Sequence, residues 1–119
     1  MPTTPTYNFI CFTELLNEYA PSQKTVVEKK IKRRLKYYTL EGYDALRVEG
    51  VRTLKTDLYT EITQYSESLY YQKSNAEYSA LEDFDISRMV ADYHRKYPSI
   101  DHEEMQAFIN LALYHFYLR

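Results

Sequence analysis

Lysine and arginine side chains are concentrated in one short stretch of this 119-residue chain. The segment "SQKTVVEKKIKRRLKYY", residues 22–38, holds seven of them in the thirteen positions from Lys24 to Lys36, although the formal net charge of the chain is -2. Cations on one rigid face can bind a polyanion, because each phosphate that they neutralise releases condensed counterions and the gains add across contacts. The stretch is therefore either a phosphate-binding surface or simply the solvated face of a helix.

The apolar residues of this stretch predict a helix from about Gln23 to Tyr38, with Ser22 as its N-cap. At 100 degrees per residue they fall within about 80 degrees of one another, so one side of the helix is expected to face a core. Only Glu28 offers an i,i+4 partner within the run, to Lys32, so the other cations lack the pairing typical of a solvated helix. The apolar residues are Val27, Ile31, Leu35 and Tyr38; the opposite side carries Thr25, Lys29, Lys32, Arg33 and Lys36, and Lys24, Lys30 and Arg34 flank the apolar side.

Other residue types that carry chemistry show no productive spacing. The histidines lack an HxxxH pair on one helix, and the single cysteine, Cys11, lies in an apolar segment without basic neighbours. Glu82, Asp83 and Asp85 are interpreted as loop and cap residues, and the two glycines, Gly42 and Gly50, are too few for a phosphate-binding loop. We therefore expect no metal, no cofactor and no catalytic site, and we do not expect an enzyme. The histidines are His94, His102 and His115.

Most of the remaining chain has helical periodicity. Residues 1–7 are expected to form a flexible arm, and helices are expected over residues 8–19, from Thr56 or Asp57 to about residue 73, from Asp85 to Pro98, and over residues 102–118. The last of these is apolar nearly all round in "NLALYHFYL", which indicates a central helix or one that pairs with a second copy of the chain.

The segment "ALRVEGVRTLK", residues 45–55, alternates as a β-hairpin would. Glu49 and Gly50 would supply its turn. The basic residues of this hairpin would be Arg47 and Arg52 near the tip and Lys55 at the base.

The order of helix, turn, basic helix, hairpin and helix resembles the winged helix-turn-helix of the excisionase and MerR-like DNA-binding families. "SQKTV" is similar to the start of their recognition helix, "RVEGVRTLK" to the wing and "TDLYTEI" to the helix that follows. The resemblance covers about residues 8–65 and implies regulation of transcription or of DNA recombination, with double-stranded DNA as the partner. It implies that Ser22, Gln23, Lys24 and Thr25 approach bases, that Lys29, Lys32, Arg33 and Lys36 hold phosphates, and that Arg47, Arg52 and Lys55 form the wing contact.

The sequence thus predicts a mostly α protein with one small hairpin: an arm at 1–7, a winged helix-turn-helix at 8–72, and a helical segment at 73–119 that packs on it or dimerises. Residues 1–60 carry a net charge of +3 and residues 61–119 a net charge of -5, an asymmetry that favours contact with a polyanion at one end. No apolar run is long enough for a transmembrane helix, and a cytoplasmic protein is expected. The alternative is a non-enzymatic helical interaction module or homodimer that binds another protein through a face rich in its 14 tyrosines.

Overall fold

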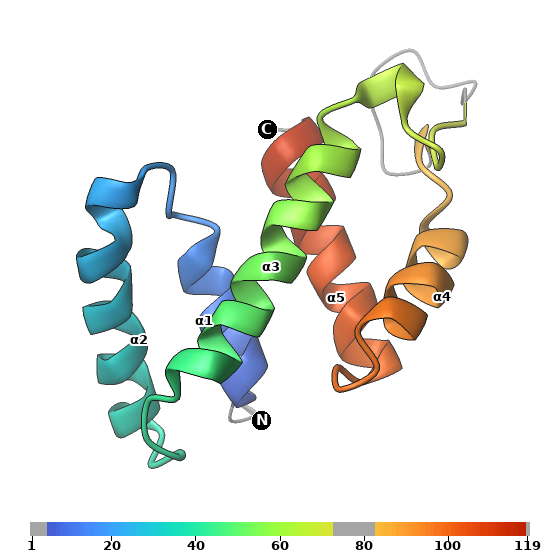
Figure 1. Ribbon diagram of the computed structural model, residues 1–119. Coiled ribbons are helices and arrows are strands. Elements are labelled where there is room, and N and C mark those ends of the chain that lie inside the picture. Colours follow the sequence, from blue (N-terminus) through green and yellow to red (C-terminus); the bar gives the residue numbers. More distant parts are fainter. Residues whose placement is uncertain (1–4, 73–82, 119) are drawn as a thin grey trace. The chain divides into compact units, whose positions relative to one another are not determined.

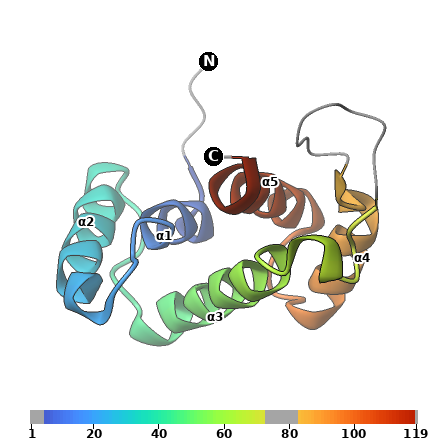
Figure 2. The same ribbon diagram turned by 90° about the horizontal axis from the view of Figure 1, so that it is seen from above.

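The computed structural model describes residues 5–72 and 83–118, and helices account for most of them (Figures 1 and 2). The chain divides into two compact units, Met1–Lys55 and Thr56–Arg119. Among the described helices, none is long and apolar enough to cross a membrane. The elements are α1 (Tyr7–Leu15), η1 (Pro21–Gln23), α2 (Lys24–Tyr37), α3 (Ala45–Ile62), η2 (Tyr65–Glu67), α4 (Ile86–Lys96), α5 (His102–Leu113) and η4 (Tyr114–Leu118).

The first unit consists of α1, α2 and the beginning of α3. The Thr6 hydroxyl accepts a hydrogen bond from the Phe9 N–H and so caps α1, after which α2 runs back alongside α1 (Figure 1). The Tyr7 hydroxyl donates to the Gly42 carbonyl at 3.0 Å and accepts from the Asp44 N–H at 2.7 Å, which ties the start of α1 to the start of α3. The core of this unit is formed by Ile10, Cys11, Phe12, Leu15, Val27, Ile31, Leu35, Val48, Val51 and Leu54.

The second unit contains the rest of α3 together with α4 and α5, which pack closely on each other. The Asp85 carboxylate caps α4 by accepting from the Arg88 N–H at 3.2 Å, as the sequence predicts, and Pro98 follows its end. The buried side chains of α5 are covered by the chain itself. The core of this unit includes Leu58, Ile62, Phe84, Met89, Val90, Ile100, Met105, Phe108, Ile109 and Leu113.

The β-hairpin predicted over residues 45–55 is wrong, because this segment forms the first eleven residues of α3. The described residues contain no strand and only one isolated bridge, between Tyr71 and Phe84. A helix is favoured here because the buried residues recur at intervals of three and four and so form one helical stripe. These residues are Val48, Val51, Leu54, Leu58 and Ile62. A tight hairpin turn at Glu49-Gly50 would require left-handed backbone, whereas neither glycine has a positive φ.

The fold is therefore not a winged helix-turn-helix, since the element that would form the wing does not exist. Of the predicted N-terminal arm, residues 1–4 lie outside the described residues, Thr6 caps α1 and Tyr7 is its first, buried residue. The helix predicted from Thr56 or Asp57 to about residue 73 is also different: α3 begins at Ala45 and ends at Ile62, and η2 follows it at Tyr65–Glu67.

Candidate nucleic-acid interface

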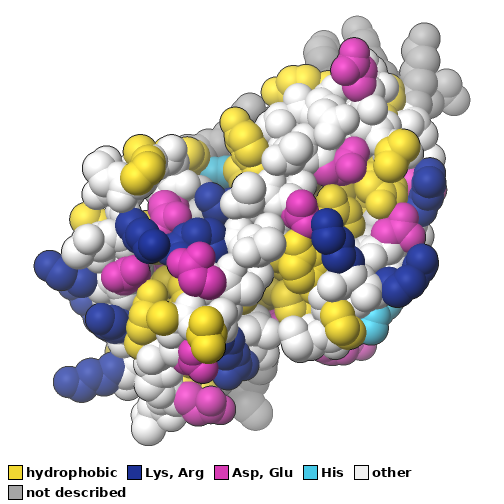
Figure 3. All heavy atoms as spheres, in the orientation of Figure 1, with side chains coloured by type: hydrophobic (Ala, Val, Ile, Leu, Met, Phe, Trp, Pro, Cys, Tyr) yellow, Lys and Arg dark blue, Asp and Glu magenta, His cyan; other side chains and the backbone are white. Residues whose placement is uncertain are grey.

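The face of α2 that is directed away from the core carries most of the exposed cations of the first unit. The buried residues Val27, Ile31 and Leu35 hold the opposite side of the helix against α1, so the outer side is fixed by their packing. In Figure 3 lysine and arginine side chains project into solvent along the edge that α2 occupies in Figure 1. The exposed residues of this outer face are Thr25, Val26, Lys29, Lys30, Arg33, Lys36 and Tyr37.

Four of these residues, which we call the cationic face, have no acidic partner among the described residues: Lys29, Lys30, Arg33 and Lys36. The other basic residues of the unit all have a partner within the described residues, an acidic one for four of them, the Tyr43 ring for Lys32 and the Glu18 backbone carbonyl for Lys55. The ion pairs are Arg34 with Glu14 at 3.1 Å, Arg47 with Glu41 at 3.5 Å, Arg52 with Glu18 at 2.9 Å and Lys24 with Glu49 at 3.8 Å, while the Lys32 ammonium lies 5.0 Å from the centroid of the Tyr43 ring. Four of the six carboxylates of this unit thus pair with cations elsewhere, and none that the structure describes pairs with the cationic face.

The residues expected to approach bases, Ser22 to Thr25, lie at the turn into α2. Ser22 does not cap the helix, because η1 intervenes and α2 begins at Lys24. Gln23 has a local role instead: its Oε1 accepts hydrogen bonds from the Tyr19 N–H at 2.6 Å and the Ala20 N–H at 2.9 Å. Its acceptor atom is therefore engaged by the turn in the structure.

Replacing Gln23 with alanine should therefore destabilise the first unit by about 1 kcal/mol, because two backbone N–H groups lose their acceptor. Thermal denaturation followed by circular dichroism measures the effect. Gln23→Glu is the matched control, since a carboxylate oxygen can take the place of the amide oxygen as acceptor, and this variant should retain most of the stability. Equal melting temperatures for wild type and the alanine variant would contradict this role of Gln23.

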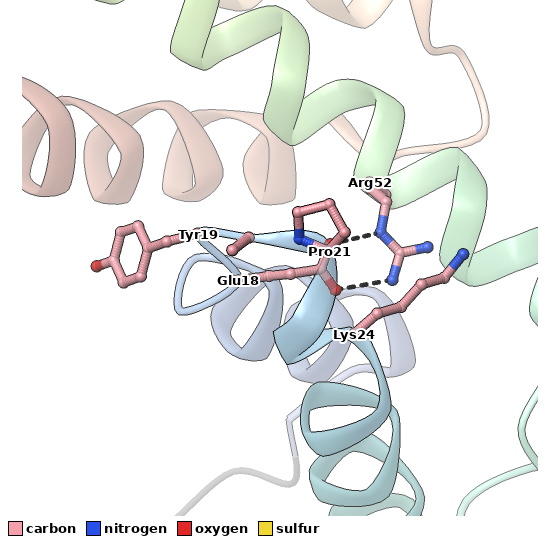
Figure 4. Close-up of a pocket in the computed structure, with 6 residues that line it drawn as sticks. Glu18, Tyr19, Pro21, Lys24 and Arg52 are labelled. Atoms are coloured by element: carbon pink, nitrogen blue, oxygen red, sulfur yellow. Dashed lines mark hydrogen bonds and ion pairs between the residues drawn. The ribbon is translucent and has the colours of Figure 1, made fainter.

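Arg52 and Lys55, expected in a wing, instead face the turn that follows α1. The Arg52 guanidinium forms a two-pronged pair with Glu18, Nε to Oε1 at 2.9 Å and Nη2 to Oε2 at 3.0 Å (Figure 4). Its Nη1 also bonds Glu49. The Lys55 ammonium donates to the Glu18 carbonyl at 3.3 Å; burial lowers the pKa of Lys55, although the Glu18 carboxylate opposes this shift. Both side chains hold the turn against α3, so neither lies on a wing.

A hollow of about 340 Å³ lies beside this ion pair. Its walls come from the turn after α1, the first residue of α2 and one residue of α3, and Arg52 is only 13% exposed there. All five N–H donors of a guanidinium lie in one plane. All three nitrogens of Arg52 already donate to carboxylates, Nε and Nη2 to Glu18 and Nη1 to Glu49. The hollow is therefore a feature of the turn and not a ready anion site. The residues that line it are Glu18, Tyr19, Ala20, Pro21, Lys24 and Arg52.

Arg47, the third predicted wing residue, also has intramolecular partners. Its guanidinium carbon lies 4.0 Å from the centroid of the Tyr7 ring, and its Nε donates to the Asn8 side-chain oxygen at 3.3 Å. This cation–π contact joins the first turn of α3 to the first turn of α1. Arg47 is thus committed to packing between two helices, although part of it is exposed.

Two features of the outer face were missed by sequence reasoning. Lys30, expected to flank the apolar side, is exposed with the cationic face. Tyr37, for which the sequence predicts no role, is 78% exposed. Both could have been found from the helical wheel, because Val26, Lys30, Arg33 and Tyr37 are separated by four, three and four residues and so form one stripe.

The residues with metal-binding or nucleophilic chemistry do not assemble into a second site. Within the described ranges, no group of three or more His, Cys, Asp or Glu residues could hold a metal ion. The rings of His94 and His102 meet edge to face, with 5.7 Å between centroids. Burial is the main reason that the pKa of Cys11 rises to about 11, so this thiol is protonated and unreactive near neutral pH.

Searches for similar proteins returned no matching family model, no matching curated protein and no matching solved structure. The resemblance to the excisionase and MerR-like families therefore rests on the sequence alone. Conclusions about function must come from the geometry of this chain.

Proposed function

We propose that the protein is a non-enzymatic nucleic-acid-binding protein that contacts phosphates through the cationic face of α2. The observation that supports this proposal is selective pairing: Lys29, Lys30, Arg33 and Lys36 lack acidic partners among the described residues, whereas Lys24, Arg34, Arg47 and Arg52 have them. A helix face that only had to be soluble would normally intersperse both signs of charge. The first unit, residues 1–55, carries ten Lys or Arg against six Asp or Glu, a net charge of +4.

The spacing of the cationic face suits a phosphate backbone. Lys29 and Lys36 are seven residues apart, which is about 10 Å along the helix axis. Duplex DNA presents one negative charge per roughly 1.7 Å of its axis, so about six charges lie within that span and four cations can each find a phosphate. Double-stranded DNA, expected from the sequence, is therefore a suitable ligand, and a cytoplasmic location forms part of this proposal.

Little sequence preference is expected of this interface. Direct readout of bases needs side chains such as Gln, Asn or a bidentate Arg placed in a groove. The acceptor of Gln23 is engaged by the turn, and Arg47 and Arg52 are engaged by Asn8, Glu41, Glu18 and Glu49. Contacts with phosphates position a protein on nucleic acid without reading its sequence.

A second candidate function is a protein interaction module, in which the same cationic face meets an acidic partner. The exposed apolar side chains of the second unit favour it: Tyr59, Tyr65, Leu69 and Tyr114 are all at least half exposed. Exposed aromatic residues are enriched at protein interfaces. A homodimer through the C-terminal helix would use Tyr114, since Phe108, Ile109, Ala112 and Leu113 are already buried within the chain.

Replacing Lys29 and Arg33 together with alanine should weaken binding to random-sequence duplex DNA. Each lost phosphate contact removes about 0.9 from the slope of log affinity against log salt, so the double variant should lose about 1.8. Fluorescence anisotropy with a labelled duplex, at a series of salt concentrations, measures both affinity and slope. The matched control is Arg95→Ala with Lys96→Ala, which changes the net charge equally but removes cations paired with Asp92 and Asp57 in the second unit.

The control variant should bind duplex DNA as wild type does. If the two double variants weaken binding equally, general charge and not the cationic face is responsible, and the proposal is overturned. No binding of wild-type protein at low salt to either duplex or single-stranded DNA would also reject it. A parallel titration with vesicles containing phosphatidylserine separates nucleic acid from an anionic membrane surface, because tighter binding to vesicles would assign the face to lipid.

A further inference from the structure

Tyr37 lies at the end of α2 with most of its ring in solvent. At 78% its exposed fraction is the largest of any tyrosine in the described part of the chain. The rings of Tyr37 and Tyr38 meet edge to face with centroids 4.9 Å apart, and Tyr38 is half-buried, so the contact supports Tyr37 from the side of the protein. An aromatic ring supported in this way and left mostly open to water offers an apolar surface on which another flat group can stack.

The neighbours of Tyr37 on the helix surface are cations. Arg33 precedes it by four residues and Lys36 by one, and both belong to the cationic face. Residues four apart on a helix lie next to each other, so the ring continues the line of Lys30 and Arg33. The outer face thus combines charges that suit phosphates with a ring that suits the flat face of a base.

This combination distinguishes between two forms of nucleic acid. In a duplex the faces of the bases are stacked within the helix and only their edges are accessible in the grooves. In a single strand the bases are free to stack on aromatic side chains, and proteins that bind single strands combine cations along the backbone with such rings. An exposed ring on a convex helix face has no corresponding role against the backbone of a duplex.

We propose that the nucleic acid held by α2 is single-stranded, with one unpaired base stacked on Tyr37 and adjacent phosphates paired with Arg33, Lys36 and their neighbours. This inference rests on the proposed function and specifies its ligand. Contact with phosphates alone would favour the duplex, because its charge density and counterion release are higher than those of a single strand. Stacking on Tyr37 contributes binding free energy that is available only to a single strand. This contribution is less sensitive to salt than the ionic contacts.

The test compares a labelled single-stranded oligonucleotide with the duplex of the same sequence by fluorescence anisotropy, at low salt and at about 0.2 M salt. Wild type should bind the single strand more tightly, and the preference should grow with salt. Tyr37→Ala should weaken single-strand binding by roughly five- to one-hundred-fold and leave duplex binding within about twofold. Tyr37→Phe keeps the ring and should behave as wild type. Tyr114→Ala removes another exposed tyrosine, 65% exposed in the second unit, and should change neither affinity.

The two proposals can fail separately in this experiment. The single-strand inference would be overturned if wild type bound the duplex more tightly, or if Tyr37→Ala lost affinity equally for both ligands. Either result would leave the phosphate-binding proposal in place. If neither ligand binds, or if Lys29→Ala with Arg33→Ala has no effect on either, the phosphate-binding proposal fails first. Circular dichroism of each variant confirms that Tyr37→Ala is folded, which is expected for a side chain so exposed.

Discussion

Replacing Arg52 with alanine is expected to reduce the free energy of unfolding by about 2 to 4 kcal/mol. The guanidinium is 13% exposed and its partner Glu18 is 12% exposed, so the pair is largely shielded from solvent. Removing one member leaves the Glu18 carboxylate without its two hydrogen bonds in a site from which water is mostly excluded, and an uncompensated charge in such a place is costly. Urea denaturation followed by circular dichroism measures the loss.

Three companion variants separate this explanation from a general loss of charge. Arg33→Ala removes a cation from the exposed outer face of α2 and should change stability by less than about 0.5 kcal/mol. Arg52→Lys keeps the charge but not the planar fork and should recover only part of the loss. Adding Glu18→Gln to Arg52→Ala removes the stranded carboxylate and should restore some stability, so the two changes should not be additive.

The same variant also decides between a hairpin and a helix for residues 45–55. A wing residue at the tip of a hairpin would contribute to DNA affinity and little to stability, because it would be exposed in the free protein. In the helix Arg52 contributes to stability, and its loss should affect binding only through the folded fraction. A fully stable Arg52→Ala protein with reduced DNA affinity would contradict the arrangement of α3 and Glu18.

The amphipathic character of α2 could be predicted from the sequence because it depends only on local spacing. Val27, Ile31 and Leu35 lie on one side by the geometry of any α-helix, and the structure buries all three. The turn before α2 could also be predicted from the sequence. Gln23 follows Ala20 by three residues, which is the spacing of a side chain that reaches back to the start of a helix.

The roles of the three predicted wing residues could not be predicted, because their partners are distant in sequence. Arg47 meets Asn8 across 39 positions, Arg52 meets Glu18 across 34, and Lys55 meets the Glu18 carbonyl across 37. Such pairs are set by how helices pack, which local periodicity does not contain. The alternation in "ALRVEGVRTLK" was misleading for a related reason: a short segment of alternating residues can also be read as part of a longer helical stripe, here one that continues to Ile62.

Raising the pH above 10 should destabilise the second unit because three of its tyrosines keep their protons when folded. Burial, followed by nearby carboxylates, raises the pKa of Tyr70 to about 12 and raises the pKa values of Tyr93 and Tyr97 further. The Tyr70 hydroxyl donates to Asp92 at 2.8 Å and the Tyr97 hydroxyl donates to Asp57, whose negative charges oppose a phenolate. In the unfolded chain the same tyrosines ionise near their ordinary pKa of 10.0.

Proton linkage determines whether the free energy of unfolding rises or falls with pH. Below pH 10 both states hold these protons and the tyrosines add no pH dependence. Between pH 10 and about 12 the unfolded state releases protons that the folded state retains, so the free energy of unfolding falls by up to about 1.4 kcal/mol per pH unit for each tyrosine. Stability that is fully present below pH 10 is thus lost progressively as the pH rises towards the folded pKa values.

Tyr70→Phe isolates one of these contributions. At about pH 8 the variant should be roughly 1 kcal/mol less stable than wild type, because Asp92 loses a hydrogen bond. As the pH rises towards 12, wild type loses the linked stability of Tyr70 and the variant does not, so the difference should shrink and then reverse. Urea denaturation at a series of pH values measures the crossover.

Tyr114→Phe, an exposed tyrosine of the same unit, is the control and should follow wild type throughout. A constant difference between Tyr70→Phe and wild type across the series would mean that the Tyr70 hydroxyl is not held beside Asp92 in the folded protein, because only a proton retained there links its stability to pH.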